Sequence, residues 1–185
     1  MQTFVKNAIV GLSIAATFLF ISVSAQAQVL AHSGDAAGYG GYVNVGSGGG
    51  NHAYFGGSGG YNLAPSVTVF GEYSYVPLPD SAHVQLYGGG ARFNFLTSTK
   101  VVPYAVAAFG GGHGSIDGAS GNGWYAGFGG GASIFCGKNW GVRPEYRYER
   151  VESSGSGVNN SVIVGGVFYQ WGGTGSKKKA VSAQK

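Results

Sequence analysis

The sequence predicts an all-β fold: a closed, eight-stranded, antiparallel up-and-down transmembrane β-barrel. Three observations support this prediction. Side chains alternate in character with a period of two, most of the alternating segments are longer than the strands of a soluble sheet, and short connections alternate with longer ones. Strands can cross a bilayer only as a closed barrel, because every backbone N–H and C=O group must be paired there.

The first 27 residues predict a secretory signal peptide. Lys6 provides a short positive region, residues 8–23 form a continuous apolar run, and Ala25-Gln26-Ala27 is a small-x-small cleavage site. The alternative, a retained membrane anchor, is disfavoured because the apolar run is short for a spanning helix. We therefore expect the mature chain to begin at Gln28.

The predicted barrel spans residues 28–171. Its strands are expected at residues 38–47, 52–63, 66–76, 82–95, 101–114, 122–136, 139–152 and 160–171. Tight turns are expected at residues 63–66, 96–100 and 136–139, and longer loops at 47–51, 76–81, 115–123 and 153–160. Short turns at one end and longer loops at the other are typical of outer-membrane barrels.

The seventh predicted strand indicates which face of the wall is which. In VRPEYRYERVE, which begins at Val142, apolar and aromatic residues alternate with charged ones. A basic side chain on the lipid face would cost up to about 2–4 kcal/mol near the bilayer midplane, so we expect the charges to face the lumen. The same alternation in two other predicted strands, VTVFGEYSY and GGGARFNF, adds Glu72 and Arg92 to the inner face. The predicted lumen ionic cluster, with three acids and three bases, is Glu72, Arg92, Arg143, Glu145, Arg147 and Glu149. The alternative is that these are exposed charges on a soluble barrel.

Glycine accounts for 37 of the 185 residues and is concentrated inside the predicted strands. An aromatic residue followed by three glycines occurs at residues 87–90, 109–112 and 128–131. Folding the strands about their turns brings the last of these triplets close to Glu145. Small residues there would leave room for long charged side chains in a narrow eight-stranded interior. Relief of sheet curvature is a second explanation, and both can hold.

The last strand, SVIVGGVFYQW, carries a glycine followed by aromatic residues two apart: Gly166, Tyr169 and Trp171. With these features the chain resembles the small eight-stranded outer-membrane barrels of bacteria, the OmpA transmembrane domain and OmpX-like proteins. The resemblance implies that these three residues are a barrel-assembly signal read by the barrel-assembly machinery. It also implies a place in the bacterial outer membrane, contact with its lipid and lipopolysaccharide, and a structural or surface-interaction role, with a surface ligand or the cell wall as a further partner. Members of the family usually end on the final aromatic residue, whereas this chain continues.

Charge argues against a nucleic-acid partner. The formal net charge is +4, but Lys6 lies in the signal peptide and four lysines lie in residues 172–185, so the remaining body carries −1. Residues 172–185 are expected to be a basic, disordered periplasmic tail. The single cysteine, Cys136, cannot form an internal disulfide.

Three other activities have weaker support. His113-Gly114-Ser115 resembles the His-x-Ser element of outer-membrane lipid A deacylases, but the acid that orients the histidine has no counterpart in the following WYAGFGGG. A small passive channel is disfavoured because Phe70, Tyr104 and the ionic cluster would obstruct the lumen. His83 and His113 could meet at the rim and hold a transition metal. We predict a protein that is not an enzyme and has no cofactor and no metal site.

Overall fold

The computed structural model describes residues 28–46, 48–80, 82–116, 119–153 and 156–174. The predicted signal peptide and the part of the predicted tail after Thr174 lie outside the described residues. No helix in the described ranges is long and apolar enough to cross a membrane.

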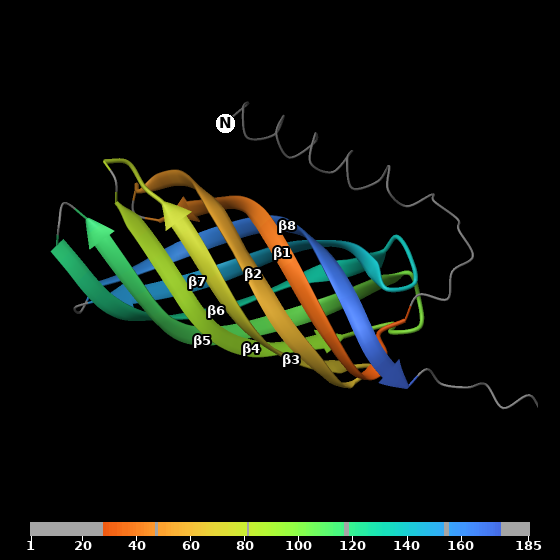
Figure 1. The fold of residues 1–185 in the computed structure, drawn as a ribbon. Helices are drawn as coiled ribbons and strands as arrows, with labels where there is room; N and C mark the ends of the chain where they lie inside the picture. Colours follow the sequence, from red (N-terminus) through yellow and green to blue (C-terminus); the bar gives the residue numbers. More distant parts are fainter. Residues whose placement is uncertain (1–27, 47, 81, 117–118, 154–155, 175–185) are drawn as a thin grey trace, which may run out of the picture.

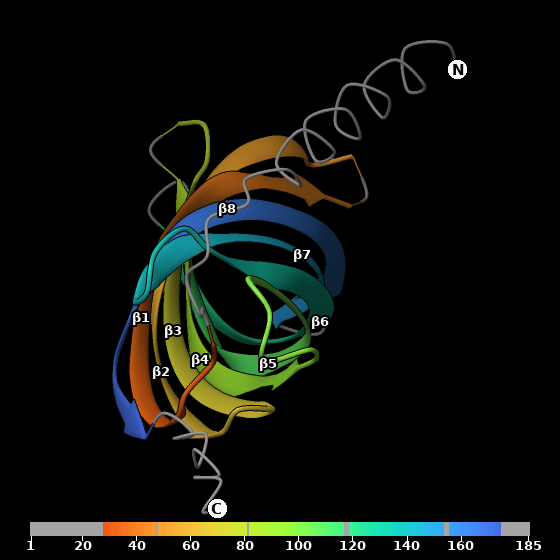
Figure 2. The ribbon, with the colours of Figure 1, turned by 90° about the vertical axis from the view of Figure 1, so that its right-hand side faces the viewer.

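Antiparallel strands follow one another around a single closed barrel (Figure 1). They are β1 (Ala31–Val45), β2 (Gly50–Ala64), β3 (Val67–Pro77), β4 (His83–Asn94), β5 (Val101–Ile116), β6 (Ala119–Phe135), β7 (Trp140–Ser153) and β8 (Ser156–Thr174). Each strand pairs with the next, and β1 also pairs with β8 from Ala31 opposite Thr174 to Val45 opposite Asn160. The end-on view of Figure 2 shows the ring that this closure forms. The predicted fold class is confirmed.

The two ends of the barrel differ. We call the end where residues 65–66, 95–100 and 136–139 join the strands the turn end, and the opposite end the loop end. β1 begins and β8 ends at the turn end, on the right in Figure 1. The strand boundaries are close to those predicted, except that β1 begins at Ala31 and β8 runs from Ser156 to Thr174. These extensions follow from closure, because each of these strands supplies the hydrogen-bond partners of the other.

The two longest predicted loops are much shorter in the structure. Strand pairing between β5 and β6 continues up to Ile116 opposite Ala119, and pairing between β7 and β8 continues up to Ser153 opposite Ser156. Glycine, serine and asparagine in these segments indicated turns. Ladder hydrogen bonds involve backbone groups that every non-proline residue has, so the pairing extends through these residues.

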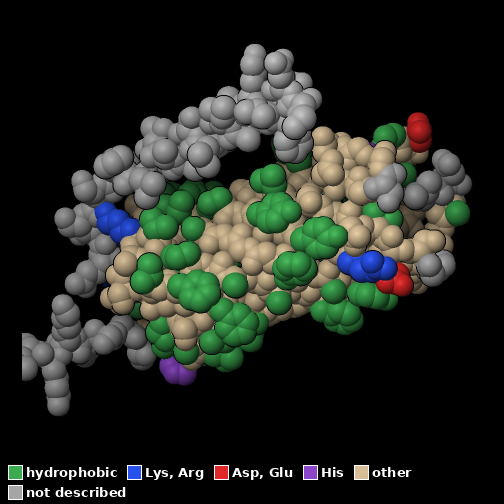
Figure 3. Space-filling view, turned by 180° about the vertical axis from the view of Figure 1, so that it is seen from behind, with side chains coloured by type: hydrophobic (Ala, Val, Ile, Leu, Met, Phe, Trp, Pro, Cys, Tyr) green, Lys and Arg blue, Asp and Glu red, His purple; other side chains and the backbone are tan. Residues whose placement is uncertain are grey.

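The wall has an apolar outer surface with aromatic residues towards both ends. Along β3 and β7 buried and exposed residues alternate strictly over most of the strand. Exposed aromatic side chains include Tyr61, Phe93 and Trp140 near the turn end and Tyr42, Tyr87 and Trp124 near the loop end. On the face seen in Figure 3, hydrophobic side chains are spread over the wall with backbone and other side chains between them, and charged side chains lie towards its two ends. This is the arrangement of a barrel surrounded by lipid, with aromatic girdles at the two interfaces.

Candidate functional site: the barrel interior

Every residue of the predicted ionic cluster lies on the inner face of the barrel and is buried. The exposed fractions range from 1% for Glu149 to 9% for Arg143. Alternation along β7 places four of these side chains inside, and β3 and β4 contribute Glu72 and Arg92. The structure adds a seventh member, Asp35 of β1, which is 3% exposed. The cluster therefore has four acids and three bases rather than three of each.

Asp35 joins two of the arginines in a group at the turn end. Its Oδ2 accepts a hydrogen bond from Arg143 Nη2 at 2.6 Å and another from Arg92 Nη1 at 3.0 Å. Each guanidinium group also lies over a phenyl ring, Arg92 over Phe70 at 4.5 Å and Arg143 over Phe168 at 4.6 Å. Here two cations share one carboxylate, and aromatic faces provide further stabilisation.

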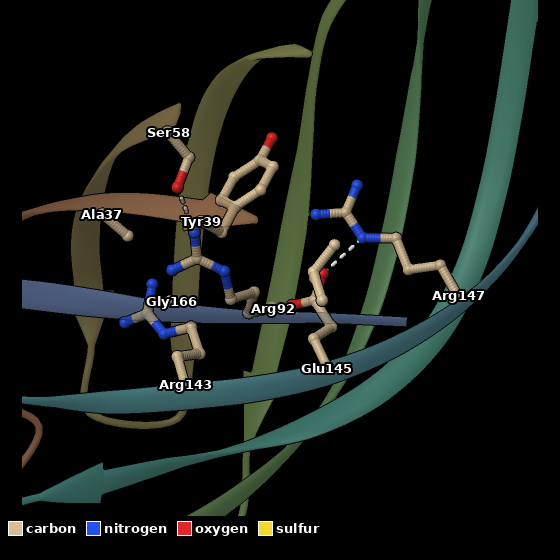
Figure 4. A pocket seen from close by; sticks show the side chains of 9 residues that line it. Ala37, Tyr39, Ser58, Arg92, Arg143, Glu145, Arg147 and Gly166 are labelled. Atoms are coloured by element: carbon tan, nitrogen blue, oxygen red, sulfur yellow. Dashed lines mark hydrogen bonds and ion pairs between the residues drawn. The ribbon is translucent and has the colours of Figure 1, made fainter. Parts of the chain in front are cut away.

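Arg147 is the centre of a second group, nearer the loop end. Its guanidinium group donates to Glu72 Oε1 at 2.6 Å and to Glu145 Oε1, and lies 3.7 Å from Glu149 Oε1. Three carboxylates therefore surround one guanidinium group. Figure 4 shows Arg147 and Glu145 projecting from β7 beside Arg92 and Arg143, so the two groups are neighbours along the interior.

Tyrosine hydroxyl groups complete the second group. Tyr104 donates to Glu145 at 2.6 Å, Tyr125 to Glu72 at 3.0 Å and Tyr54 to Glu149 at 3.5 Å. All three tyrosines are buried. Each carboxylate thus has its own tyrosine donor, which partly offsets the cost of removing an ionised group from water.

Glycines make room for these side chains. A Cβ atom at Gly131 would lie 2.6 Å from the Tyr104 hydroxyl group, one at Gly127 would lie 2.9 Å from Glu149 Cγ, and one at Gly60 would overlap Asp35 Oδ1. Gly131 pairs with Glu145 across the β6–β7 ladder, as the sequence predicted. The small residues and the long side chains are therefore complementary in space.

Almost no free space remains at mid-height. The cavity between the two arginine groups has a volume of about 10 Å³, about the minimum that a single water molecule requires. Figure 4 shows its lining, including Tyr39, Ser58 and Arg92. Towards the turn end, Phe135 and Phe168 meet edge to face at 5.0 Å and pack with Val102 and Val29.

The charged part of the interior does not extend to the loop end, a boundary that the sequence did not predict. At the loop end its inner face carries aliphatic side chains, among them Val43, Val76 and Leu86. The alternation that placed charged residues on the inner face was read only from β3, β4 and β7.

The three residues of the predicted assembly signal lie on β8. Gly166 faces inwards, where a Cβ atom would meet the carbonyl oxygen of Gly38 and the side chain of Tyr39. Tyr169 and Trp171 are half exposed on the outer face near the turn end and stack with their ring centroids 6.5 Å apart.

His113 and Ser115 do not form the acid–base arrangement of a hydrolase in the described part of the chain. They are alternate residues of β5, and His113 Nδ1 lies 2.9 Å from the amide oxygen of Asn122 rather than from a carboxylate. Asp117 lies outside the described residues. His83 pairs with Ser115, and His113 pairs with Gln85, so the two histidines are diagonal neighbours. Within the described ranges no three potential ligands gather as a metal site would require.

Comparisons with known proteins give matches at the level of structure. No family model and no curated protein sequence matches the chain. Neisserial surface protein A matches with a TM-score of 0.61 and 18% identity over 75% of this chain and 95% of that protein. The chain has the fold of the small outer-membrane β-barrels. The N-terminal barrel domain of Pseudomonas aeruginosa OprF (TM-score 0.56, 19% identity, covering 77% and 99%) and Ail, the attachment invasion locus protein of Yersinia pestis (0.51, 18%, covering 77% and 99%), share this barrel.

Sequence reasoning placed Tyr104 in the lumen but missed Asp35 and the other two tyrosine donors, Tyr54 and Tyr125. Asp35 was overlooked because the first strand was expected to begin at residue 38, and its length could have been estimated from that of its partner, the last strand. Tyr54 and Tyr125 have the same parity as inward-facing residues of their strands, so extending the parity test to tyrosine could have identified them.

Proposed function

We propose that the protein is an integral barrel of the bacterial outer membrane with a structural or surface-interaction role, and that it is not an enzyme. The observation that carries this proposal is the contrast between the two faces of the wall. The outer face is apolar and aromatic, whereas seven charged side chains from four strands are buried on the inner face. Among the strand residues that the structure describes, only Arg150 and Glu152, near the loop end, are charged with outward-facing side chains.

The ionic cluster has the proposed role of closing the lumen. Its support is the volume of about 10 Å³ left between the arginine groups, together with the packed Phe135 and Phe168 below them. A hydrated ion would have to break buried charge pairs in order to pass. Such pairs are costly to separate once they are desolvated.

The proposed partners follow from the surface. Exposed aromatic residues such as Trp124 and Trp140 would contact lipid and, in the outer leaflet, lipopolysaccharide. Gly166, Tyr169 and Trp171 would be recognised by the barrel-assembly machinery. The lysines of the tail lie outside the described residues and would face the inner leaflet or the cell wall. A surface ligand would approach from the loop end.

Membrane insertion is tested by gel migration with and without heating. A refolded membrane barrel should migrate differently before and after boiling, and flotation with liposomes should retain it in the lipid fraction. A chain that stays in the aqueous fraction and shows no heat-dependent shift would overturn the proposal.

Orientation is tested with a membrane-impermeant maleimide on intact cells. Asn51→Cys and Asp80→Cys, made in a Cys136→Ser background, place thiols on exposed positions at the loop end and should react. The natural Cys136 is exposed at the turn end and is the matched control, which should react only after lysis. Labelling of Cys136 on intact cells, with the loop sites protected, would reverse the orientation.

A further inference from the structure

The loop end of the barrel interior contains a cavity of about 800 Å³. This is within the range of about 300–1,000 Å³ that is usual for small-molecule sites. Its wall is mainly aliphatic and comes from several strands, with Val43 of β1, Val76 of β3, Val84 and Leu86 of β4, Val151 of β7 and Val158 of β8.

Part of this wall is packed: Val43, Val76 and Leu86 are buried in one hydrophobic cluster, and Val84 and Val151 are partly buried against it. At the turn end, inward-facing residues pack against one another across the barrel, as Phe135 and Phe168 do. At the loop end, the wall instead surrounds open space. Where the partly buried side chains of Val84, Val151 and Val158 border the cavity, an apolar ligand would remove both surfaces from water.

The floor of the cavity is acidic. Glu149 lines it and is 1% exposed, and its Oε2 atom has no hydrogen-bond partner among the described residues. Its other oxygen receives only a long hydrogen bond of 3.5 Å from Tyr54 and lies 3.7 Å from Arg147. Arg147 is already engaged by Glu72 and Glu145, so Glu149 is the least well compensated carboxylate of the group.

A second acceptor stands beside it. Asn160 pairs directly with Glu149 across the β7–β8 ladder and also lines the cavity, and its buried Oδ1 atom has no partner in the described part of the chain. Two unpaired oxygen acceptors next to each other, one of them from a carboxyl group, match a group with several N–H donors and a positive charge. An ammonium group has three such donors, whereas a carboxylate or an ether has none.

We propose that the loop end of the barrel is a binding site for a lipophilic amine, with its apolar body against the valine-rich wall and its ammonium group on Glu149 and Asn160. A cation there would balance the excess of carboxylates around Arg147. The apolar wall would favour a hydrocarbon body over a hydrated metal ion. This inference needs only the barrel interior and does not depend on the membrane location proposed above.

Binding can be measured by calorimetric titration or by NMR shifts of the refolded full-length chain, with aminoadamantane as the probe. This molecule is compact and water-soluble, which limits its loss into detergent. Adamantane carboxylate has the same body with the opposite charge. We expect saturable binding of the amine at one site and no saturable binding of the carboxylate.

Two variants locate the site. Glu149→Gln keeps the shape of the side chain and should weaken amine binding by about tenfold to a hundredfold, the range expected for a hydrogen bond to a charged group. Val76→Trp should occupy part of the cavity and weaken binding. The control is Glu152→Gln, which removes an acid from the outer face of β7, the strand that carries Glu149, and should leave affinity unchanged.

Heat-modifiable migration of each variant shows whether it has folded, and only folded variants are compared. Unchanged affinity in Glu149→Gln, or equal binding of the amine and the carboxylate, would refute the site. Amine binding by a chain that fails to enter liposomes would refute the membrane proposal and leave this inference standing.

Discussion

The turn end and the loop end of the interior are built from the same strands, yet they have opposite physical characters. At the turn end and mid-height, seven buried charges, tyrosine hydroxyl groups and two phenylalanines leave about 10 Å³ between the arginines. At the loop end, aliphatic side chains surround about 800 Å³. We therefore assign most of the stability to the filled polar region and ligand contact to the region that surrounds the cavity.

The largest effect should come from the residue that joins the two arginines at the turn end. Asp35→Ala leaves Arg92 and Arg143 buried side by side without their shared carboxylate. The free energy of unfolding, measured in urea after refolding into lipid, should fall by about 3–5 kcal/mol. Glu152→Ala breaks only an exposed pair and should cost about 0–1 kcal/mol. Equal effects would contradict the view that the first pair is buried.

Truncating one inward-facing apolar residue at each end compares the packing of the two ends more directly. Phe168 is 2% exposed and packs against Phe135 and Arg143, so Phe168→Ala should cost about 3–5 kcal/mol. Val158 lies on the cavity wall at the loop end, and Val158→Ala should cost less than about 1 kcal/mol because its side chain is only partly buried. The same urea titration measures both. A large loss at Val158 would mean that the loop end is packed.

Glycine replacements should show where space is needed. Gly131→Ala would place a methyl group on the Tyr104 hydroxyl group, and overpacking of this kind costs about 1–3 kcal/mol. Gly165→Ala meets nothing within 4 Å and should be neutral or stabilising by less than about 1 kcal/mol. If both variants were equally stable, the glycines would serve curvature rather than accommodation of the charged network.

Sequence reasoning was most successful where one strand carried an unambiguous pattern. The alternation of charges and aromatics in β7 predicted the inner face of Arg143, Glu145, Arg147 and Glu149, and the eight-stranded fold followed from strand length and turns. Asp35 was missed because the length of β1 is determined by its pairing with β8, a contact distant in sequence. The apolar loop end was missed because parity says which residues face inwards but not at what height they lie. That height depends on the strand register.

The central claim is that Arg147 and Glu145 form part of one buried network on the inner face of the barrel. A double-mutant cycle of Arg147→Ala and Glu145→Ala, with unfolding followed in urea, tests it. We predict that the double variant loses about 0.5–3 kcal/mol less than the sum of the single variants, because either substitution alone strands the other charge. Tyr146→Ala, on the outer face between them, should combine additively with either. Single losses of only about 0–1 kcal/mol that add without coupling would place these charges in water and contradict the account.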